Sequence, residues 1–317
     1  MTAAIAAIVV ILLSALIVGW TKHLKVLDIP NERSSHVNPT ARGGGIAIAG
    51  ITIIGTALTA PRMWPFLTAA AVIAILGWID DVKNINAGLR FAVQLAAASA
   101  VVFVYSPIQR IAGITFPLWF AIPITVIWIV ALTNAYNFVD GIDGIAGSQA
   151  VIAGAAWCAI ASGTVSTIAL LIAAASVGFL IHNWPPASIF MGDVGSAFLG
   201  FSLAVFPLLD RRPATSVIAF VVIFPFLFDS AYTLICRVIK RERVWKAHRS
   251  HLYQRLVIAG WSHRGVTLLY AGVAIANAAT ALLISRGIRG AYALAALTLV
   301  ASAAMLLTLT FRAERAP

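Results

Sequence analysis

Residues 3–20 read AAIAAIVVILLSALIVGW, a stretch without a single charged side chain. A helix that crosses a bilayer needs about 20 consecutive, mostly apolar residues. The stretch therefore predicts a membrane-spanning helix at the start of the chain. Its first cations, Lys22 and Lys25, follow the apolar run instead of preceding it, which favours a retained helix over a cleaved signal peptide.

The same character extends over the whole chain. Of its 317 residues, 61% are apolar and 10% are charged, and the mean hydropathy is +0.95. Soluble domains have about 45–50% apolar and about 25% charged residues, so a soluble enzyme and a disordered chain are both excluded. We expect one all-α domain over residues 1–317, a polytopic integral membrane protein with ten or eleven transmembrane helices. The candidate spans are 3–20, 45–60, 65–79, 89–105, 117–133, 149–163, 165–182, 196–209, 215–237, 266–285 and 290–310.

The net charge of +11 is informative through its distribution. Lys and Arg accumulate in cytoplasmic loops of membrane proteins. If the N-terminus is outside, 16 of the 22 cations lie in cytoplasmic segments. The sequence therefore predicts this orientation, and the positive charge calls for no nucleic-acid partner. The predicted cytoplasmic loops are about 21–44, 80–88, 134–147, 183–195 and 238–264.

Five acidic residues fall on this same predicted face, and acids beside a bilayer are candidates for function. They are Asp80, Asp81, Asp140, Asp143 and Asp193. An isolated pair of loop acids needs no function, but five on one face beside a cationic loop are harder to explain by solvation alone. Adjacent carboxylates offer the hard oxygen ligands that suit Mg²⁺ with a phosphate substrate.

Polar side chains recur every three residues between positions 134 and 143, at Asn134, Asn137, Asp140 and Asp143. This spacing keeps them on one side of a helix. Gly141 and Gly144 follow two of these acids and allow the backbone to break and approach a ligand. The run places amides and carboxylates at a membrane boundary, which indicates a polar site instead of packing.

Two further segments carry groups suited to a nucleotide. The Asn183 amide can read the edge of a base, Phe190 can stack on one, and Asp193 lies between glycines where it can reach a metal. Further along, the His248-Arg249-Ser250-His251 segment offers several hydrogen-bond donors for phosphate oxygens.

Taken in order, these motifs resemble the polyprenyl-phosphate N-acetylhexosamine-1-phosphate transferases of glycosyltransferase family 4. The resemblance extends from about residue 21 to 255. It rests on Asp28-x-Pro30 with Arg33 and His36, Gly43-Gly44, Asp80-Asp81, Asn134-x-x-Asn137-x-x-Asp140-Gly141-x-Asp143-Gly144, Asn183, Phe190-Met191-Gly192-Asp193-x-Gly195-Ser196, and His248-Arg249-x-His251-Leu252.

The resemblance implies an enzyme with its active site on the cytoplasmic face of the bacterial inner membrane. A UDP-N-acetyl-aminosugar would react with a polyprenyl phosphate such as undecaprenyl phosphate, held among membrane lipids. UMP would leave and a polyprenyl-diphospho-sugar would remain. The family implies Mg²⁺ as cofactor, with Mn²⁺ as an alternative, and some members form homodimers.

The family also implies roles for individual residues. Asp80, Asp81 and Asp193 are the expected catalytic acids, with Asp80 as a candidate base toward the lipid phosphate. The expected metal ligands are Asp193, Asn137 and Asp81. The uridine and sugar are expected at Asn134, Asp140, Asp143, Asn183 and Phe190, and the phosphates at Arg90, His248, Arg249 and His251.

The last loop carries His248-Arg249-Ser250-His251 in place of the triple histidine of the peptidoglycan member. This pattern looks most like the branch that starts O-antigen or other surface polysaccharides, using UDP-GlcNAc or UDP-linked FucNAc or QuiNAc. A phospho-MurNAc-pentapeptide transferase is the alternative within the family. A secondary transporter is the alternative of another class, although such proteins often show internal repeats and place their acids near the midplane.

Overall fold

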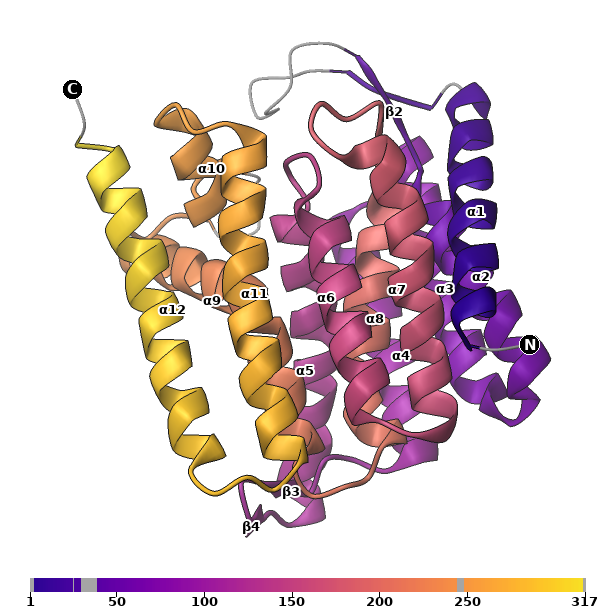
Figure 1. Ribbon diagram of the computed structural model, residues 1–317, viewed down its shortest axis with the longest axis vertical. Coiled ribbons are helices and arrows are strands. Elements are labelled where there is room, and N and C mark those ends of the chain that lie inside the picture. The colour runs from indigo at the N-terminus through magenta and orange to yellow at the C-terminus, as the bar shows by residue number, and fades with distance from the viewer. Residues whose placement is uncertain (1–2, 25, 30–38, 244–247, 316–317) are drawn as a thin grey trace.

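The computed structural model describes residues 3–24, 26–29, 39–243 and 248–315. In this part of the chain most residues belong to helices that stand side by side in one bundle (Figure 1). The helices are α1 (Ala3–Thr21), α2 (Gly45–Thr59), α3 (Trp64–Lys83), α4 (Ala87–Tyr105), α5 (Leu118–Val139), α6 (Ile145–Ile160), α7 (Gly163–Asn183), α8 (Asp193–Leu209), α9 (Thr215–Ile239), α10 (Leu252–Ile258), α11 (His263–Ser285) and α12 (Ala291–Ala313).

Each of the eleven predicted spans corresponds to one of these helices, and α10 is an additional short one. Among the described residues, eight helices are long and apolar enough to cross a membrane. The apolar helices α2, α6 and α8 are shorter, with 15, 16 and 17 residues. The chain is therefore a mostly helical, multi-pass membrane protein, as predicted.

Two predicted loops begin later than expected. Helix α3 continues to Lys83 and contains Asp80 and Asp81, while α5 continues to Val139 and contains Asn134. Hydropathy locates only the apolar part of a helix. The helix itself continues through polar residues when their side chains find hydrogen-bond partners. The Asn134 amide, for example, donates to the backbone oxygen of Val130 at 2.8 Å.

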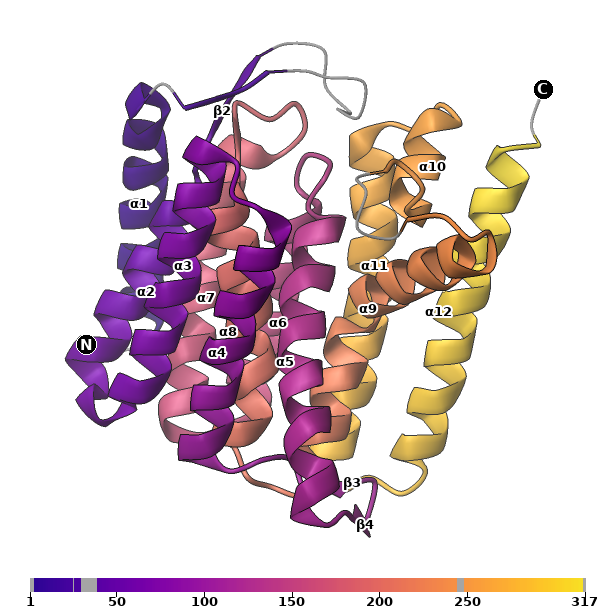
Figure 2. The same ribbon diagram turned by 180° about the vertical axis from the view of Figure 1, so that it is seen from behind.

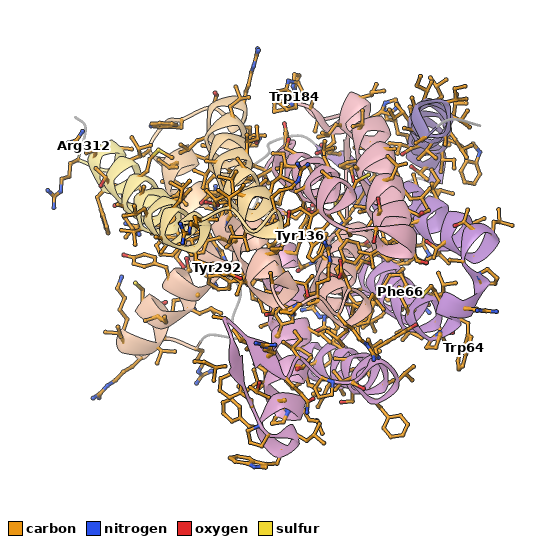
Figure 3. The ribbon with its side chains drawn as sticks, turned by 60° about the horizontal axis from the view of Figure 1, so that its bottom comes forward. Trp64, Phe66, Tyr136, Trp184, Tyr292 and Arg312 are labelled. Carbon is orange, nitrogen blue, oxygen red and sulfur yellow. The ribbon has the colours of Figure 1, made fainter. Side chains whose placement is uncertain are left out.

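Helix α8 forms the centre of the bundle, and its residues 194–208 are all buried. Helices α3 and α5 pack against it along much of their length. Tyr136 of α5 is fully buried near the middle, whereas Trp64 and Arg312 point outward at the rim (Figure 3). This arrangement holds the start of α8 against the ends of α3 and α5.

A small three-stranded sheet closes one end of the bundle. Strand β2 (Thr40–Arg42) pairs antiparallel with β1 (Leu27–Asp28) and parallel with β5 (Ile189–Phe190). The sheet thereby joins the first predicted loop to the segment before α8. The hairpin of β3 (Arg110–Ile111) and β4 (Ile114–Thr115) lies at the opposite end (Figure 1).

Helix α9 changes direction along its length. It contains Pro225, which lacks the N–H of a regular helical turn and bends the helix. Its second half runs obliquely toward α12 instead of continuing along the bundle (Figure 2). This half carries Asp229 and leads into the last predicted loop.

Candidate active site

Three carboxylates and two guanidinium groups meet at the sheet end of the bundle. Arg42, the last residue of β2, lies with Nε 2.9 Å from Asp81 Oδ1 and with Nη2 2.8 Å from Asp193 Oδ1. Arg90 of α4 donates from Nη1 to Asp80 and lies 3.2 Å from Asp193 Oδ2. Asp193 is thus shared by both arginines, and the predicted acids Asp80, Asp81 and Asp193 form one cluster.

Asp81 lies at the base of this cluster, with its side chain 0% exposed. Its two oxygens accept hydrogen bonds from the backbone N–H groups of Asp193 at 2.8 Å and Val194 at 3.1 Å. The first N–H groups of a helix have no partner inside the helix and favour a negative charge. Asp81 therefore fixes the start of α8, and its predicted metal contact remains a prediction.

Gly192 makes this contact sterically feasible. It has φ +78°, and a Cβ there would lie 2.5 Å from Asp81 Oδ2. Asp80 faces the other way, accepting from the backbone N–H of Ile85 at 2.6 Å as well as from Arg90. The adjacent acids therefore have different environments, one buried against α8 and the other held by the turn after α3.

The end of α5 brings amides and a further acid to the cluster. Asn137 donates to Ser196 Oγ at 2.9 Å and lies within hydrogen-bond reach of Asp193. Asn134 donates to Gln94 Oε1 at 2.6 Å, which fixes α5 against α4.

Asp140 follows the end of α5, and burial raises its pKa to about 8. The attraction of Arg42 lowers this pKa, whereas repulsion from Asp193 and Asp81 raises it further.

Two of the residues predicted to bind the uridine, Asn183 at the end of α7 and Asp143 after α5, belong to neighbouring segments and already bind the protein. Asn183 accepts from the N–H of Gly144 and donates to the backbone oxygen of Ile189, both at 2.9 Å. Asp143 accepts from the N–H of Ala187 at 3.0 Å. These contacts shape the loops, and base recognition by Asn183 stays a prediction.

Phe190 lies in β5 and is half-buried. Its backbone oxygen accepts from the N–H groups of Gly43 and Gly44 at 3.1 and 3.0 Å, beside the register pair of Arg42 with Phe190. The glycine motif of the first loop therefore positions Arg42 next to the segment that precedes Asp193. Pro30, Arg33 and His36 of the same predicted motif lie outside the described residues.

The basic group before α10 is ordered by contacts with α9. His251 Nδ1 lies 3.0 Å from Asp229 Oδ1, and the rings of His248 and His251 stack with centroids 5.0 Å apart. Burial, together with the neighbouring His251 ring and the charge of Arg237, lowers the pKa of His248 to about 4. His248 is therefore neutral near pH 7 and offers a phosphate a neutral N–H, whereas Arg249 carries a permanent charge.

Three important residues were absent from the predicted site. The sequence contains only a weak indication of a role for Arg42, namely that it directly precedes the Gly43-Gly44 motif. For Asp229 the indication was clearer, because it is an acid inside the apolar run 215–237. Nothing in the sequence indicated a role for Tyr253, because its contact is with a distant segment. Its hydroxyl donates to the backbone oxygen of Phe138 at 3.0 Å, across 115 positions.

The donor atoms of the cluster are compatible with Mg²⁺. Two guanidinium groups face three carboxylates, which leaves one negative charge uncompensated. In the described part of the chain no three His, Cys, Asp or Glu side chains form a complete metal cage. Mg²⁺ commonly binds one or two carboxylates and completes its shell with water and substrate phosphates, so an all-protein cage is not required.

Comparison with curated proteins finds relatives along most of the chain. The "Probable undecaprenyl-phosphate N-acetylglucosaminyl 1-phosphate transferase" of Bacillus subtilis is 34% identical over 77% of this chain and 73% of its own length. The decaprenyl-phosphate N-acetylglucosaminephosphotransferase of Mycobacterium tuberculosis is 31% identical over 92% and 84%. A phospho-N-acetylmuramoyl-pentapeptide-transferase of Nostoc is 30% identical over 77% and 74%.

The family model "Glycosyl transferase family 4" matches residues 63–209. This region runs from the start of α3 to the end of α8 and contains Asp80, Asp81, Arg90, Asn137 and Asp193. The family match and the long alignments with its curated members agree with the order of motifs in the sequence. The chain therefore belongs to glycosyl transferase family 4, together with the polyprenyl-phosphate N-acetylglucosamine-1-phosphate transferases.

Proposed function

We propose that the protein transfers N-acetylglucosamine 1-phosphate from UDP-GlcNAc to a polyprenyl phosphate, releasing UMP. The observation that carries this proposal is the cluster of Asp80, Asp81 and Asp193, bridged by Arg42 and Arg90 at one end of a membrane-spanning bundle. The names of the relatives in Bacillus and Mycobacterium support the sugar and the lipid.

The residues of the cluster are suited to phosphoryl transfer. That reaction needs the reacting groups to be positioned and the charge on the phosphate oxygens to be neutralised. Arg42 and Arg90 are fixed by carboxylates and offer N–H groups to phosphate oxygens, with bidentate binding available to a planar guanidinium. Asp81 acts indirectly in this proposal, because it fixes the start of α8 and thereby the backbone of Asp193.

Asp193 and Asn137 would hold Mg²⁺, or Mn²⁺ in its place, which would neutralise diphosphate oxygens when bound. Asp80 accepts from Arg90 and from the Ile85 N–H. A role for Asp80 as base is a secondary part of the proposal, because a phosphate monoester is already largely ionised near neutral pH. The main task of Asp80 would be to hold Arg90 against Asp193.

The acceptor would reach the cluster through the membrane. The cluster lies at the ends of α3, α5 and α8, where the phosphate of a lipid with an apolar tail would meet a spanning helix. We further propose that this end is cytoplasmic, as the distribution of cations predicts. Cysteines at Arg243 and Ile288, placed separately in a background without Cys158 and Cys236, test the orientation. An impermeant thiol reagent added outside intact cells should label only the Ile288 position, and the reverse result would contradict the orientation.

A phospho-MurNAc-pentapeptide transferase is the second candidate, since a Nostoc enzyme of that name is 30% identical. Purified protein should be incubated with undecaprenyl phosphate and either UDP-GlcNAc, UDP-linked FucNAc or QuiNAc, or UDP-MurNAc-pentapeptide. We expect UMP release and lipid-linked sugar with UDP-GlcNAc, lost with EDTA and restored by Mg²⁺. Product from the pentapeptide donor alone would favour the second candidate, and product from a 6-deoxy sugar would favour an O-antigen role. Binding of UDP-sugar without UMP release would overturn the transferase proposal.

A further inference from the structure

Asp229 is a fully buried carboxylate that the proposed reaction does not use directly. It lies on α9, four residues after Pro225, where the helix departs from the bundle axis. A buried carboxylate is costly unless it is paired and hydrogen-bonded. Its partners therefore show what the carboxylate is there to hold.

The carboxylate accepts from several donors on other elements. Oδ1 lies 3.0 Å from His251 Nδ1 and accepts from the N–H of Leu252 at 2.9 Å. Oδ2 accepts from the N–H of Tyr253 at 3.1 Å and from the hydroxyl of Tyr270 at 2.5 Å. Thr233, one turn along α9, adds a hydroxyl 3.3 Å from Oδ1. A set made only of donors matches an ionised carboxylate, which accepts and cannot donate.

These bonds determine how His251 is presented. With Asp229 accepting at Nδ1, the neutral imidazole carries its proton on Nδ1 and leaves the Nε2 lone pair available. His251 is only 3% exposed and its ring stacks with that of His248, so the ring is fixed in orientation as well. The N–H of His251 also donates to Gln254 Oε1 at 3.3 Å.

The same carboxylate places α10 relative to the acidic cluster. It binds the first two N–H groups of α10, and the next contact runs through Tyr253 to the backbone oxygen of Phe138. Phe138 is two residues from Asp140, and a Cβ at Gly141 would lie 2.0 Å from the Tyr253 hydroxyl. One continuous set of contacts therefore runs from Asp229 through α10 to the end of α5.

We infer that Asp229 is a positioning residue for the transfer reaction: it fixes the tautomer of His251 and holds the His248–His251 segment against the end of α5. This inference rests on the proposed function. It is analogous to the carboxylates behind metal-binding histidines, whose loss costs about 10- to 100-fold in activity. Asp229 itself would contact neither the substrate nor the metal.

A double-mutant cycle tests the inference, because residues that act through one another have non-additive effects. Asp229→Asn should lower kcat about 10- to 100-fold, with the KM for UDP-GlcNAc changed much less. In a His251→Gln background the same substitution should cause less than a twofold further loss. Asp210→Asn is the matched control, since Asp210 pairs with Arg212 outside the cluster and should leave kcat unchanged in both backgrounds.

Multiplying losses in the double mutant, or a kcat of Asp229→Asn equal to that of the wild type, would overturn the inference. If Asp229→Asn does not fold, Tyr270→Phe replaces it in the cycle, because it removes one donor to the carboxylate and should lower kcat only when His251 is present. Equal losses from Tyr270→Phe with and without His251 would also overturn it. An inactive wild type would overturn the proposed function together with this inference, whereas an active wild type with multiplying losses would overturn the inference alone.

Discussion

The Nε atom of Arg42 lies 2.9 Å from Oδ1 of Asp81, and the same guanidinium reaches Asp193 with Nη2 at 2.8 Å. Arg42, at the end of β2 in the three-stranded sheet, thus joins the last turn of α3 to the first residue of α8. Asp81 is fully buried in this pair, while the Asp193 side chain is 15% exposed. Loss of the Asp81 carboxylate and loss of the Asp193 carboxylate should therefore have different effects on stability and activity.

Replacing Asp193 by Asn should abolish transfer without unfolding the protein. The substitution keeps the shape of the side chain and removes the charge that Arg42 and Arg90 share. Loss of one charge-stabilising group in an active site typically costs about 100-fold or more in kcat. The measurement is the rate of UMP release beside the melting temperature in detergent. Near-normal turnover would rule out a direct role for this carboxylate.

Replacing Asp81 by Asn should mainly destabilise the protein. Asn keeps one oxygen for a backbone N–H of α8, but it leaves Arg42 without its buried partner, and breaking a buried ion pair costs about 3–5 kcal/mol. We expect a melting temperature several degrees below that of Asp193→Asn, measured in the same detergent. An unchanged melting temperature with lost activity would instead favour a direct metal contact for Asp81.

Gly77→Ala should disturb the cluster although it adds only a methyl group. Its Cβ would lie 2.4 Å from the backbone oxygen of Asp193, which has no room to move between α3 and α8. Gly50→Ala in α2 is the matched control, because no atom beyond its own helical backbone and its chain neighbours lies within 4 Å of its added Cβ. The expected result is lost activity and stability for Gly77→Ala, with Gly50→Ala at the wild-type level. Equal behaviour of the two variants would contradict the tight α3–α8 contact.

His248 should make the folded protein less stable as the pH falls below about 6.5. Its folded-state pKa is lowered to about 4, so between about pH 6.5 and 4 the unfolded chain takes up a proton that the folded protein does not. Stability from this group is therefore present above about 6.5 and lost progressively toward 4. The melting temperature of the wild type should drop more steeply from pH 7 to 5 than that of His248→Gln. Parallel curves would show that His248 titrates normally in the folded protein.

Much of the fold could be predicted from the sequence because membrane insertion depends on local properties. The run at 3–20 became α1 (Ala3–Thr21), and each other apolar run became a helix. The ends of α3 and α5 were predicted too early, since Asp80 and Asn134 look like loop residues until their partners are known. The gathering of Asp80, Asp81 and Asp193 at one end follows from the alternation of spans, so the cluster itself was predictable.

The roles of individual residues depended on contacts between distant segments. Asp80 and Asp81 are identical neighbours in the sequence, yet one holds Arg90 and the other binds the start of α8. Likewise Asp229 is an unusual acid in an apolar run, but nothing in the run indicates that it binds His251.

Hydropathy, charge distribution and motif order are local properties of the chain, so they were enough to predict the class of protein, the approximate helices and the family. They do not predict which acid is buried, which arginine bridges the cluster or which histidine is held by a carboxylate. Those outcomes depend on hydrogen bonds and ion pairs between residues such as Arg42 and Asp193, which are 151 positions apart and meet only when the helices pack.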